Sequence, residues 1–285
     1  MRRSSVGALV LFLCATTAPA ALRVNGSTTV NPVISQAAEI LRREASIEIQ
    51  VDTVGGSSGG IAALGDGRAE IAMSSRPLSR RDRERFPEVD FRAVRIGTDA
   101  LALVVSGDVW NGGVRCLSRG QARGLYEGRI RNWRELGGPD QRIAFFNKEP
   151  GRGTWEVFAG WLYGDADSAP LVSLLEVGSN EEARSKVGST RGAITQLSAA
   201  WADGETTFPL SICEDDGDEV APTRASILAG DYPLARALYV VTDGPAEGAA
   251  RRLIDLVLSE RGQVIVERHG YMALTAPVQA GGAHP

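Results

Sequence analysis

Four short loops rich in glycine, serine and threonine recur along this chain, and three of them lie between a predicted strand and a predicted helix. Because the carboxyl ends of strands in an open α/β sheet meet at one crevice, loops that follow successive strands are expected to converge there. This recurrence restricts the possible folds more than any other feature of the sequence. The four loops are residues 26–29, 55–60, 74–76 and 148–154.

The apolar residues around these loops predict alternating strands and helices. In the first part of the chain, strands at 22–24, 47–54 and 70–73 alternate with helices at 32–41 and from 61 onward. Such a βαβαβ order implies a mainly parallel sheet with helices on both faces. Further strands are expected at 91–96, 101–105, 143–146, near 193, 208–212 and 238–241, and further helices at 117–126, 155–162, 180–187, 246–258 and 261–268.

A chain of 285 residues is long enough to form two modest hydrophobic cores. We predict an α/β protein of two lobes, each a mixed, mainly parallel sheet flanked by helices, with the ligand cleft between the lobes. Lobe 1 is predicted to comprise residues 21–104 and 237–277, and lobe 2 residues 105–236. Strands near 101–105 and 234–239 are expected to cross between them.

Both ends of the chain are expected to lie outside this fold. Residues 1–20 combine a basic start, a short apolar stretch and small residues, which is the pattern of a secretory signal. We therefore expect cleavage after Ala20 and a periplasmic protein, while Cys14 leaves a lipid-anchored form open. Residues 278–285, in a tail rich in glycine, alanine and proline, are expected to be disordered.

Charge excludes one class of partner. Without the two arginines of the signal, 29 basic residues face 35 acidic ones. A nucleic-acid partner would require a basic face, so none is expected.

The residues available for metal or nucleophilic chemistry are few. His269 and His284 are the only histidines, which leaves little material for a Ser-His-Asp catalyst or a zinc site. We expect no catalytic residue, metal or cofactor. Cys116 and Cys213 remain after signal removal, and they form either a disulfide or two separate buried thiols.

Each of the four loops offers what an oxyanion needs. A helix N-terminus exposes unpaired N–H donors and a partial positive charge, glycine lets the backbone approach closely, and hydroxyls add donors. Arg76, Lys148 or Arg152 could add full charge, and an arginine fork suits a tetrahedral oxyanion. Taken singly, each loop is better explained as a helix cap, a turn or surface charge than as an anion site. Their convergence after successive strands favours one binding site.

A set of segments in this chain carries a family resemblance: 26–30, 55–60, 71–76, 126–130 with 132–133, 151–154, 221–223 and 232–235. In combination they resemble the PstS family of phosphate-binding proteins, the periplasmic components of phosphate ABC transporters. The resemblance covers nearly the whole mature chain and implies the two-lobed type 2 periplasmic-binding-protein fold. It also implies inorganic phosphate as ligand and permease subunits at the inner membrane as partners.

The resemblance suggests a ligand-binding set within the four loops. Lys148 stands where the family often has arginine, and Arg152 where it often has serine, so the positive charge is expected from a shifted position. The candidate ligand-binding residues are Ser27, Thr28, Thr29, Ser57, Ser58, Ser75, Arg76, Lys148, Arg152, Gly153 and Thr154.

One departure from the family pattern bears on ligand choice. Some members have an aspartate where Ser75 lies, and a carboxylate would accept the proton of hydrogen phosphate and repel sulfate. Glu149 could supply such an acceptor, or it could pair with Lys148 or face solvent. Sulfate or molybdate is therefore the alternative ligand. A sensor or scavenger without a transporter, and an enzyme using Ser57 or Ser58 as nucleophile, are the alternative functions; a monomer is expected.

Overall fold

The computed structural model describes residues 21–170, 172, 174–213 and 218–274. The predicted signal at 1–20 and the predicted tail at 278–285 lie outside the described residues. Within the described part, no helix is both long enough and apolar enough to cross a membrane.

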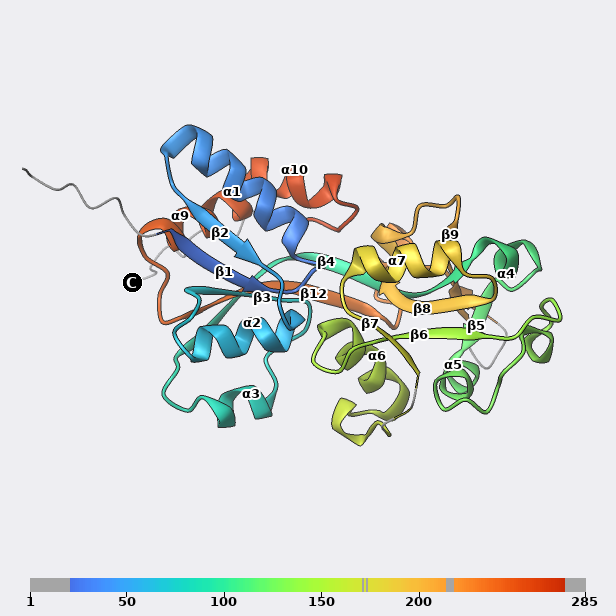
Figure 1. Ribbon diagram of the computed structural model, residues 1–285. Helices are drawn as coiled ribbons and strands as arrows, with labels where there is room; N and C mark the ends of the chain where they lie inside the picture. Colours follow the sequence, from blue (N-terminus) through green and yellow to red (C-terminus); the bar gives the residue numbers. More distant parts are fainter. Residues whose placement is uncertain (1–20, 171, 173, 214–217, 275–285) are drawn as a thin grey trace, which may run out of the picture.

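One half of the molecule, shown in blue and red in Figure 1, is built on a mixed sheet. β1 is parallel to β2 and β3, whereas β12 is antiparallel to β3 and β4. In order across the sheet, the strands are β2 (Ile49–Asp52), β1 (Leu22–Gly26), β3 (Ile71–Ser74), β12 (Ala235–Asp243) and β4 (Phe91–Ser106).

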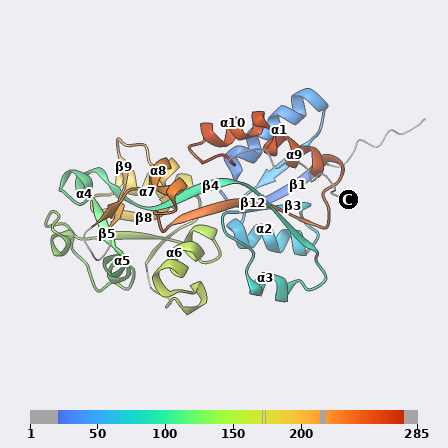
Figure 2. The same cartoon turned by 180° about the vertical axis from the view of Figure 1, so that it is seen from behind.

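Helices cover both faces of this first sheet, as the βαβαβ pattern predicts (Figures 1 and 2). One face packs against α1 (Asn31–Ala45), α9 (Gly248–Leu258) and α10 (Glu260–Arg268), which share a core with β1, β3 and β12. The other face packs against α2 (Gly56–Gly65), with α3 (Arg80–Arg85) beside it. The amphipathic pattern of α1 explains its placement, because Val33, Ile34 and Ala37 all lie in the core.

The other half has its own sheet and cores. β6 is parallel to its two neighbours, β8 and β7, while β4 pairs antiparallel with both β8 and β9. α7 packs on one face and α5 and α6 on the other (Figure 1). These elements are β8 (Ala193–Ser198), β6 (Ala144–Lys148), β7 (Leu175–Val177), β9 (Thr207–Pro209), α4 (Gly107–Asn111), α5 (Arg119–Tyr126), α6 (Gly153–Tyr163) and α7 (Asn180–Ser189).

β4 joins the two halves, because it changes partner halfway along its length. Ala100 pairs with Ala235 of β12, and the next residue, Leu101, pairs with Ser198 of β8. The predicted crossings near 101–105 and 234–239 therefore lie in β4 and at the start of β12. The proposed residue-level division of the lobes at 104/105 and 236/237 falls inside these two strands and stays a prediction.

The structure differs from the predicted elements at two places that matter for the site. Residues 91–96 and 101–105 belong to one strand, because the residues between them continue the ladder with β12 instead of turning. Residues 55–60 are not a loop throughout, since α2 already begins at Gly56. Gly55 has a φ of 74°, a left-handed conformation that glycine adopts without strain, and it turns the chain directly into this helix.

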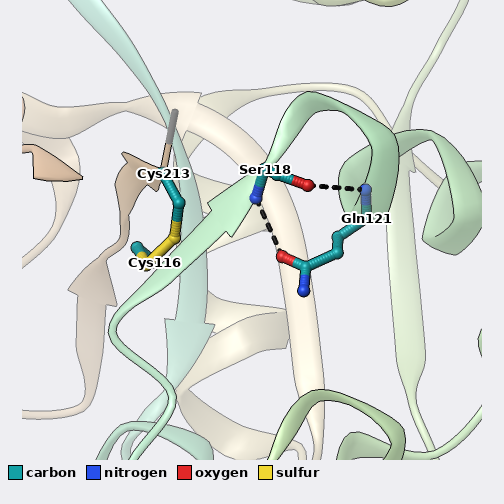
Figure 3. Close-up of a disulfide and its surroundings, with 4 residues drawn as sticks. All are labelled: Cys116, Ser118, Gln121 and Cys213. Carbon is teal, nitrogen blue, oxygen red and sulfur yellow. Dashed lines mark hydrogen bonds between the residues drawn. A yellow bond between two sulfur atoms is a disulfide. The ribbon is translucent and has the colours of Figure 1, made fainter. Parts of the chain in front are cut away.

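A small three-stranded sheet contains the disulfide between Cys116 and Cys213 (Figure 3), which decides between the two alternatives for these cysteines. The bridge joins neighbouring parallel strands, with 5.5 Å between the two Cα atoms. A crosslink across 97 residues of sequence restricts the unfolded chain, and such bridges typically contribute about 2–4 kcal/mol. Its strands are β11 (Glu219–Val220), β10 (Ser211–Cys213) and β5 (Cys116–Ser118); α8 (Arg224–Ala229) follows β11.

Figure 3 also shows how α5 begins directly after this disulfide. The Ser118 hydroxyl accepts a hydrogen bond from the Gln121 N–H, and the Gln121 side chain accepts one from the Ser118 N–H. This reciprocal capping satisfies two backbone donors, so the helix begins at Arg119, two residues later than predicted.

Candidate functional site

A small cavity of about 10 Å³ lies where the two halves of the molecule meet. Its lining comes from the start of α2 and the segment before α1 in the first half, and from the starts of α6 and α7 in the second. The lining residues are Ser27, Thr28, Thr29, Gly56, Ser57, Ser75, Lys148, Arg152, Gly153, Thr154, Gly178 and Asn180. The predicted convergence of the four loops is thus present in the structure.

Helix N-termini from both halves line this cavity. In the first half α2 begins at Gly56, in the second half α6 begins at Gly153 and α7 at Asn180, and all three residues line it. Among the hydrogen bonds between described residues, the N–H groups of Gly153 and Thr154 have no acceptor, as expected for the first turn of a helix. The aligned peptide dipoles add a partial positive charge at the same place. This arrangement attracts an anion.

Gly153 allows the two halves to come into contact. A Cβ atom at this position would lie 2.5 Å from the Ser57 Oγ and 2.6 Å from the Ser75 Oγ. No side chain fits into that space, so glycine is required for the start of α6 to reach the serines of the first half. The described geometry is therefore that of a closed molecule.

The hydroxyls around the cavity already accept hydrogen bonds from the protein. Ser27 Oγ accepts from the N–H of Thr29 at 3.2 Å, and Ser57 Oγ accepts from the N–H of Ser75 at 3.1 Å. Thr154 Oγ1 accepts from Arg236 at 2.9 Å. A hydroxyl has one hydrogen to donate, and those of Ser27 and Thr154 stay available for another acceptor. The Oγ atoms of Ser57 and Ser75 lie 3.4 Å apart and either can donate to the other, so this pair keeps at least one hydrogen for a further acceptor.

Arg236 and Asp99 form a buried ion pair directly behind the cavity. The Arg236 Nη2 lies 2.8 Å from the Asp99 Oδ2, and the two side chains are 2% and 1% exposed. Ser198 donates a further hydrogen bond to Asp99 at 2.6 Å. Burial raises the pKa of Asp99, while the Arg236 charge and the Ser198 hydroxyl act in the opposite direction.

Arg236 connects this pair to both halves of the site. Its Nη1 donates to the Thr154 Oγ1 in the second half, and its Nη2 donates to the Thr29 Oγ1 in the first, at 3.3 Å. Neither Arg236 nor Asp99 was predicted. The available signal was weak: Arg236 lies in β12 and Asp99 in β4, and both strands contain other charged residues that do not mark a site.

Lys148 lines the cavity from the end of β6 and is 1% exposed. Its ammonium group donates to the carbonyl oxygens of Gly178 at 3.1 Å and Ser179 at 2.6 Å. Burial is the main cause that lowers the pKa of Lys148 from 10.5 to about 7, and the positive charges of Arg152 and Arg236 lower it further. The lysine charge near this cavity is therefore sensitive to pH in the neutral range.

Arg152 also lines the cavity and is anchored by two partners. Its Nε and Nη2 donate to the Glu149 Oε2 at 2.9 and 2.8 Å, and its Nη1 donates to the Thr53 carbonyl at 3.3 Å. Glu149 thus pairs with Arg152, rather than with Lys148 as one of the predicted alternatives had it.

Two candidate residues, Ser58 and Arg76, are not among the lining residues. Arg76 forms ion pairs with Asp82, at 2.6 Å, and with Glu156. Ser58 donates to Glu156 at 2.7 Å and accepts from Arg76 at 2.8 Å. The reason is electrostatic, because two carboxylates largely removed from solvent hold the guanidinium beside the cavity instead of in it. Sequence patterns gave no hint of either carboxylate.

Asn180 is a lining residue that was not predicted, and its two amide atoms differ in their surroundings. It is 1% exposed, and its Nδ2 donates to the Thr29 Oγ1 at 3.1 Å. Its Oδ1 is buried and has no hydrogen-bond partner within the described part of the chain. The other lining residues outside the predicted set are Gly56 and Gly178.

A search of the same described residues finds no group of three or more histidines, cysteines, aspartates or glutamates that could hold a metal ion. The site therefore consists of hydrogen-bond donors, two cationic side chains and one unpaired amide oxygen.

Comparison with known proteins gives a consistent set of relatives. The family model described as the PBP superfamily domain matches residues 14–261. The phosphate-binding protein PstS of Bacillus subtilis is 28% identical over 260 residues, covering 90% of this chain and 82% of that protein. The PstS protein of Borreliella burgdorferi is 26% identical over 260 residues, covering 88% of this chain and 89% of that protein.

Solved structures agree with these relatives. A crystal structure from Clostridium perfringens, described as a phosphate ABC transporter substrate-binding protein with bound phosphate, has a TM-score of 0.79 and 27% identity. It covers 90% of this chain and 100% of that chain. An ABC-type phosphate transport receptor from Vibrio cholerae has a TM-score of 0.68 and 27% identity, covering 89% and 100% of the two chains.

Proposed function

The chain belongs to the PBP superfamily, and we propose that it binds inorganic phosphate in the periplasm and delivers it to the permease of an ABC transporter. The observation that carries this proposal is the donor-lined cavity at which the N-termini of α2 from the first half and of α6 and α7 from the second converge. The names of its relatives and of the similar structures support phosphate as the ligand.

The geometry suits a tetrahedral oxyanion. Hydroxyls of Ser27, Thr29, Ser57 and Thr154 have hydrogens to donate, and the start of α6 adds backbone donors. Lys148 and Arg152 supply charge from the second half. In the closed form each donor is already oriented by the protein, so little further side-chain reorganisation is required once the halves close on the anion.

Closure of the two halves is the step that a transporter would recognise. Contacts across the junction include the N–H of Ser58 with the Gly151 carbonyl at 3.1 Å and the Arg76–Glu156 ion pair. Phosphate bound between the halves would add further contacts to both and favour the closed form. We propose that the protein works as a monomer, since closure of two halves of one chain requires no partner subunit.

The first test is calorimetric titration of the mature protein, freed of bound anion, with phosphate, sulfate and molybdate at several pH values. We expect saturable phosphate binding at a stoichiometry of one. Absence of phosphate binding would refute the proposed function. Binding of sulfate or molybdate in preference to phosphate would keep the fold and replace the ligand.

Small-angle scattering tests closure. We expect saturating phosphate to reduce the radius of gyration, because the ligand bridges the two halves. Glu156→Gln should weaken phosphate binding a few-fold, since Arg76 loses a partner across the junction. The control is Glu84→Gln, which alters an exposed ion pair within α3 and should change neither quantity. A radius of gyration unaffected by phosphate would contradict the closure step.

One observation favours a different anion. Among the residues that line the cavity there is no carboxylate, so sulfate, which only accepts hydrogen bonds, is the alternative ligand. A catalytic role for Ser58 is not proposed. Its acceptor, Glu156, is paired with Arg76, and neither residue lines the cavity.

A further inference from the structure

The unpaired amide oxygen of Asn180 is unusual among the buried polar atoms of this protein. Buried side-chain acceptors nearly always have a hydrogen-bond partner, and one without a partner requires an explanation. Asn180 is 1% exposed and lines the cavity, and its Oδ1 has no partner among the described residues. An acceptor in this position can be satisfied by a donor on the ligand.

Several other acceptors at the cavity are already occupied by donors of the protein. Thr29 Oγ1 accepts hydrogen bonds from both Asn180 and Arg236, so its two lone pairs are occupied and its hydrogen can only be donated. The carbonyls of Gly178 and Ser179 accept from Lys148. The hydroxyls of Ser27, Ser57 and Thr154 each accept one hydrogen bond already, whereas the Asn180 Oδ1 is a lining acceptor that cannot donate and has no partner among the described residues.

The monoprotonated phosphate dianion has acceptor oxygens and one P–OH donor, whereas sulfate has acceptors alone. Resting on the proposed function, we infer that the Asn180 Oδ1 accepts the hydrogen bond of this P–OH group. Asn180 thereby selects protonated tetrahedral dianions, which include phosphate and arsenate, over sulfate. It fills the role for which the sequence offers no aspartate at Ser75.

An amide differs from a carboxylate in this role. It accepts the ligand proton without placing a negative charge beside a dianion, so it discriminates against sulfate through one unmade hydrogen bond and not through charge repulsion. We therefore expect a finite preference for phosphate over sulfate of about tenfold to a hundredfold.

The opposite amide orientation makes a different prediction. If Nδ2 faced the ligand and Oδ1 faced Thr29, Asn180 would be one more donor, and it would bind phosphate and sulfate equally well. The ratio of the two affinities therefore distinguishes the acceptor role from a donor role and from a purely structural role.

The experiment measures phosphate, arsenate and sulfate affinities by calorimetry for the wild-type protein, Asn180→Leu and Asn180→Asp. In Asn180→Leu the acceptor is lost, so phosphate and arsenate affinity should fall about tenfold or more and sulfate affinity much less. In Asn180→Asp an acceptor remains, so the preference for phosphate over sulfate should be kept or increased. Thr154→Val is the matched control: it removes a donor and should weaken all three anions alike.

Each outcome bears on a separate claim. Equal losses of phosphate and sulfate affinity in Asn180→Leu would overturn the acceptor role while leaving phosphate binding intact. The acceptor role would also be overturned if Asn180→Asp lost its preference for phosphate over sulfate as fully as Asn180→Leu. If Asn180→Leu fails to fold, the phosphate preference of Asn180→Asp alone tests the acceptor role. Failure of the wild-type protein to bind phosphate would refute the proposed function itself.

Discussion

Arg236→Met should lower the free energy of unfolding by about 3–5 kcal/mol, because it leaves the Asp99 carboxylate unpaired in a fully buried position. Phosphate affinity should also fall, by about tenfold or more, since Thr29 and Thr154 lose the donor that orients their hydroxyls. Chemical denaturation and calorimetry measure the two effects on the same preparation.

A double variant separates stability from binding. Asp99→Asn combined with Arg236→Met removes both charges, so most of the lost stability should return while phosphate affinity stays low. Arg251→Met is the matched control, because Arg251 forms an ion pair with Asp255 on the exposed surface of α9 and its loss should hardly affect stability. Equal stability of Arg236→Met and this control would contradict the role of the buried pair.

The order of elements in the fold could be predicted from local patterns. Apolar periodicity and glycine-rich turns indicate α1, β3, α6, α9 and α10, and their alternation indicates sheets with helices on both faces. Pairing between distant segments could not be predicted in this way. The continuity of β4 depends on β12, which follows it by more than a hundred residues and holds residues 97–100 in an extended ladder.

Most residues that line the candidate site could be predicted for a similar reason. Hydroxyl and glycine residues at strand ends are local signals, and Thr29, Ser57 and Thr154 lie at the cavity as expected. Arg236 and Asn180 both donate hydrogen bonds to the Thr29 hydroxyl, from which they are separated by 207 and 151 residues of sequence. No local pattern marks such distant contacts.

For Arg76 a local signal was present but predicted the wrong partner. An arginine after a strand end suggests an anion ligand, but the structure pairs it with Asp82 and Glu156 at the junction of the two halves. A guanidinium near a cavity binds whichever anion reaches it, and a side-chain carboxylate fixed by the fold has the advantage over a diffusible ligand. Its role in this protein is therefore better tested through closure than through ligand contact.

The effect of pH on this protein should depend largely on Lys148. Its pKa is about 7 in the folded protein without ligand and 10.5 in the unfolded chain. Between these two pH values the unfolded chain binds a proton that the folded protein does not, so the free energy of unfolding rises with pH across this window. Below pH 7 Lys148 is charged in both states, and the folded protein bears the full cost of burying that charge. Integrated over this window, the cost is on the order of 4–5 kcal/mol. In Lys148→Met this rise in the free energy of unfolding with pH should be absent, as chemical denaturation at several pH values would measure.

Phosphate binding should respond to pH in the opposite direction. A bound anion favours the charged form of Lys148 and raises its pKa, so binding above pH 7 takes up a proton and becomes weaker by up to about tenfold per pH unit. Calorimetry in two buffers of different ionisation enthalpy counts this proton. Phosphate itself also gains and loses a proton near neutral pH, and this contribution is the same in the wild-type protein and in Lys148→Met. The test is therefore the difference between the two proteins in proton uptake and in the pH dependence of phosphate affinity. Identical proton uptake and pH slopes in the two proteins would show that Lys148 is already charged before the anion arrives, because its two carbonyl partners would then outweigh the cost of burial.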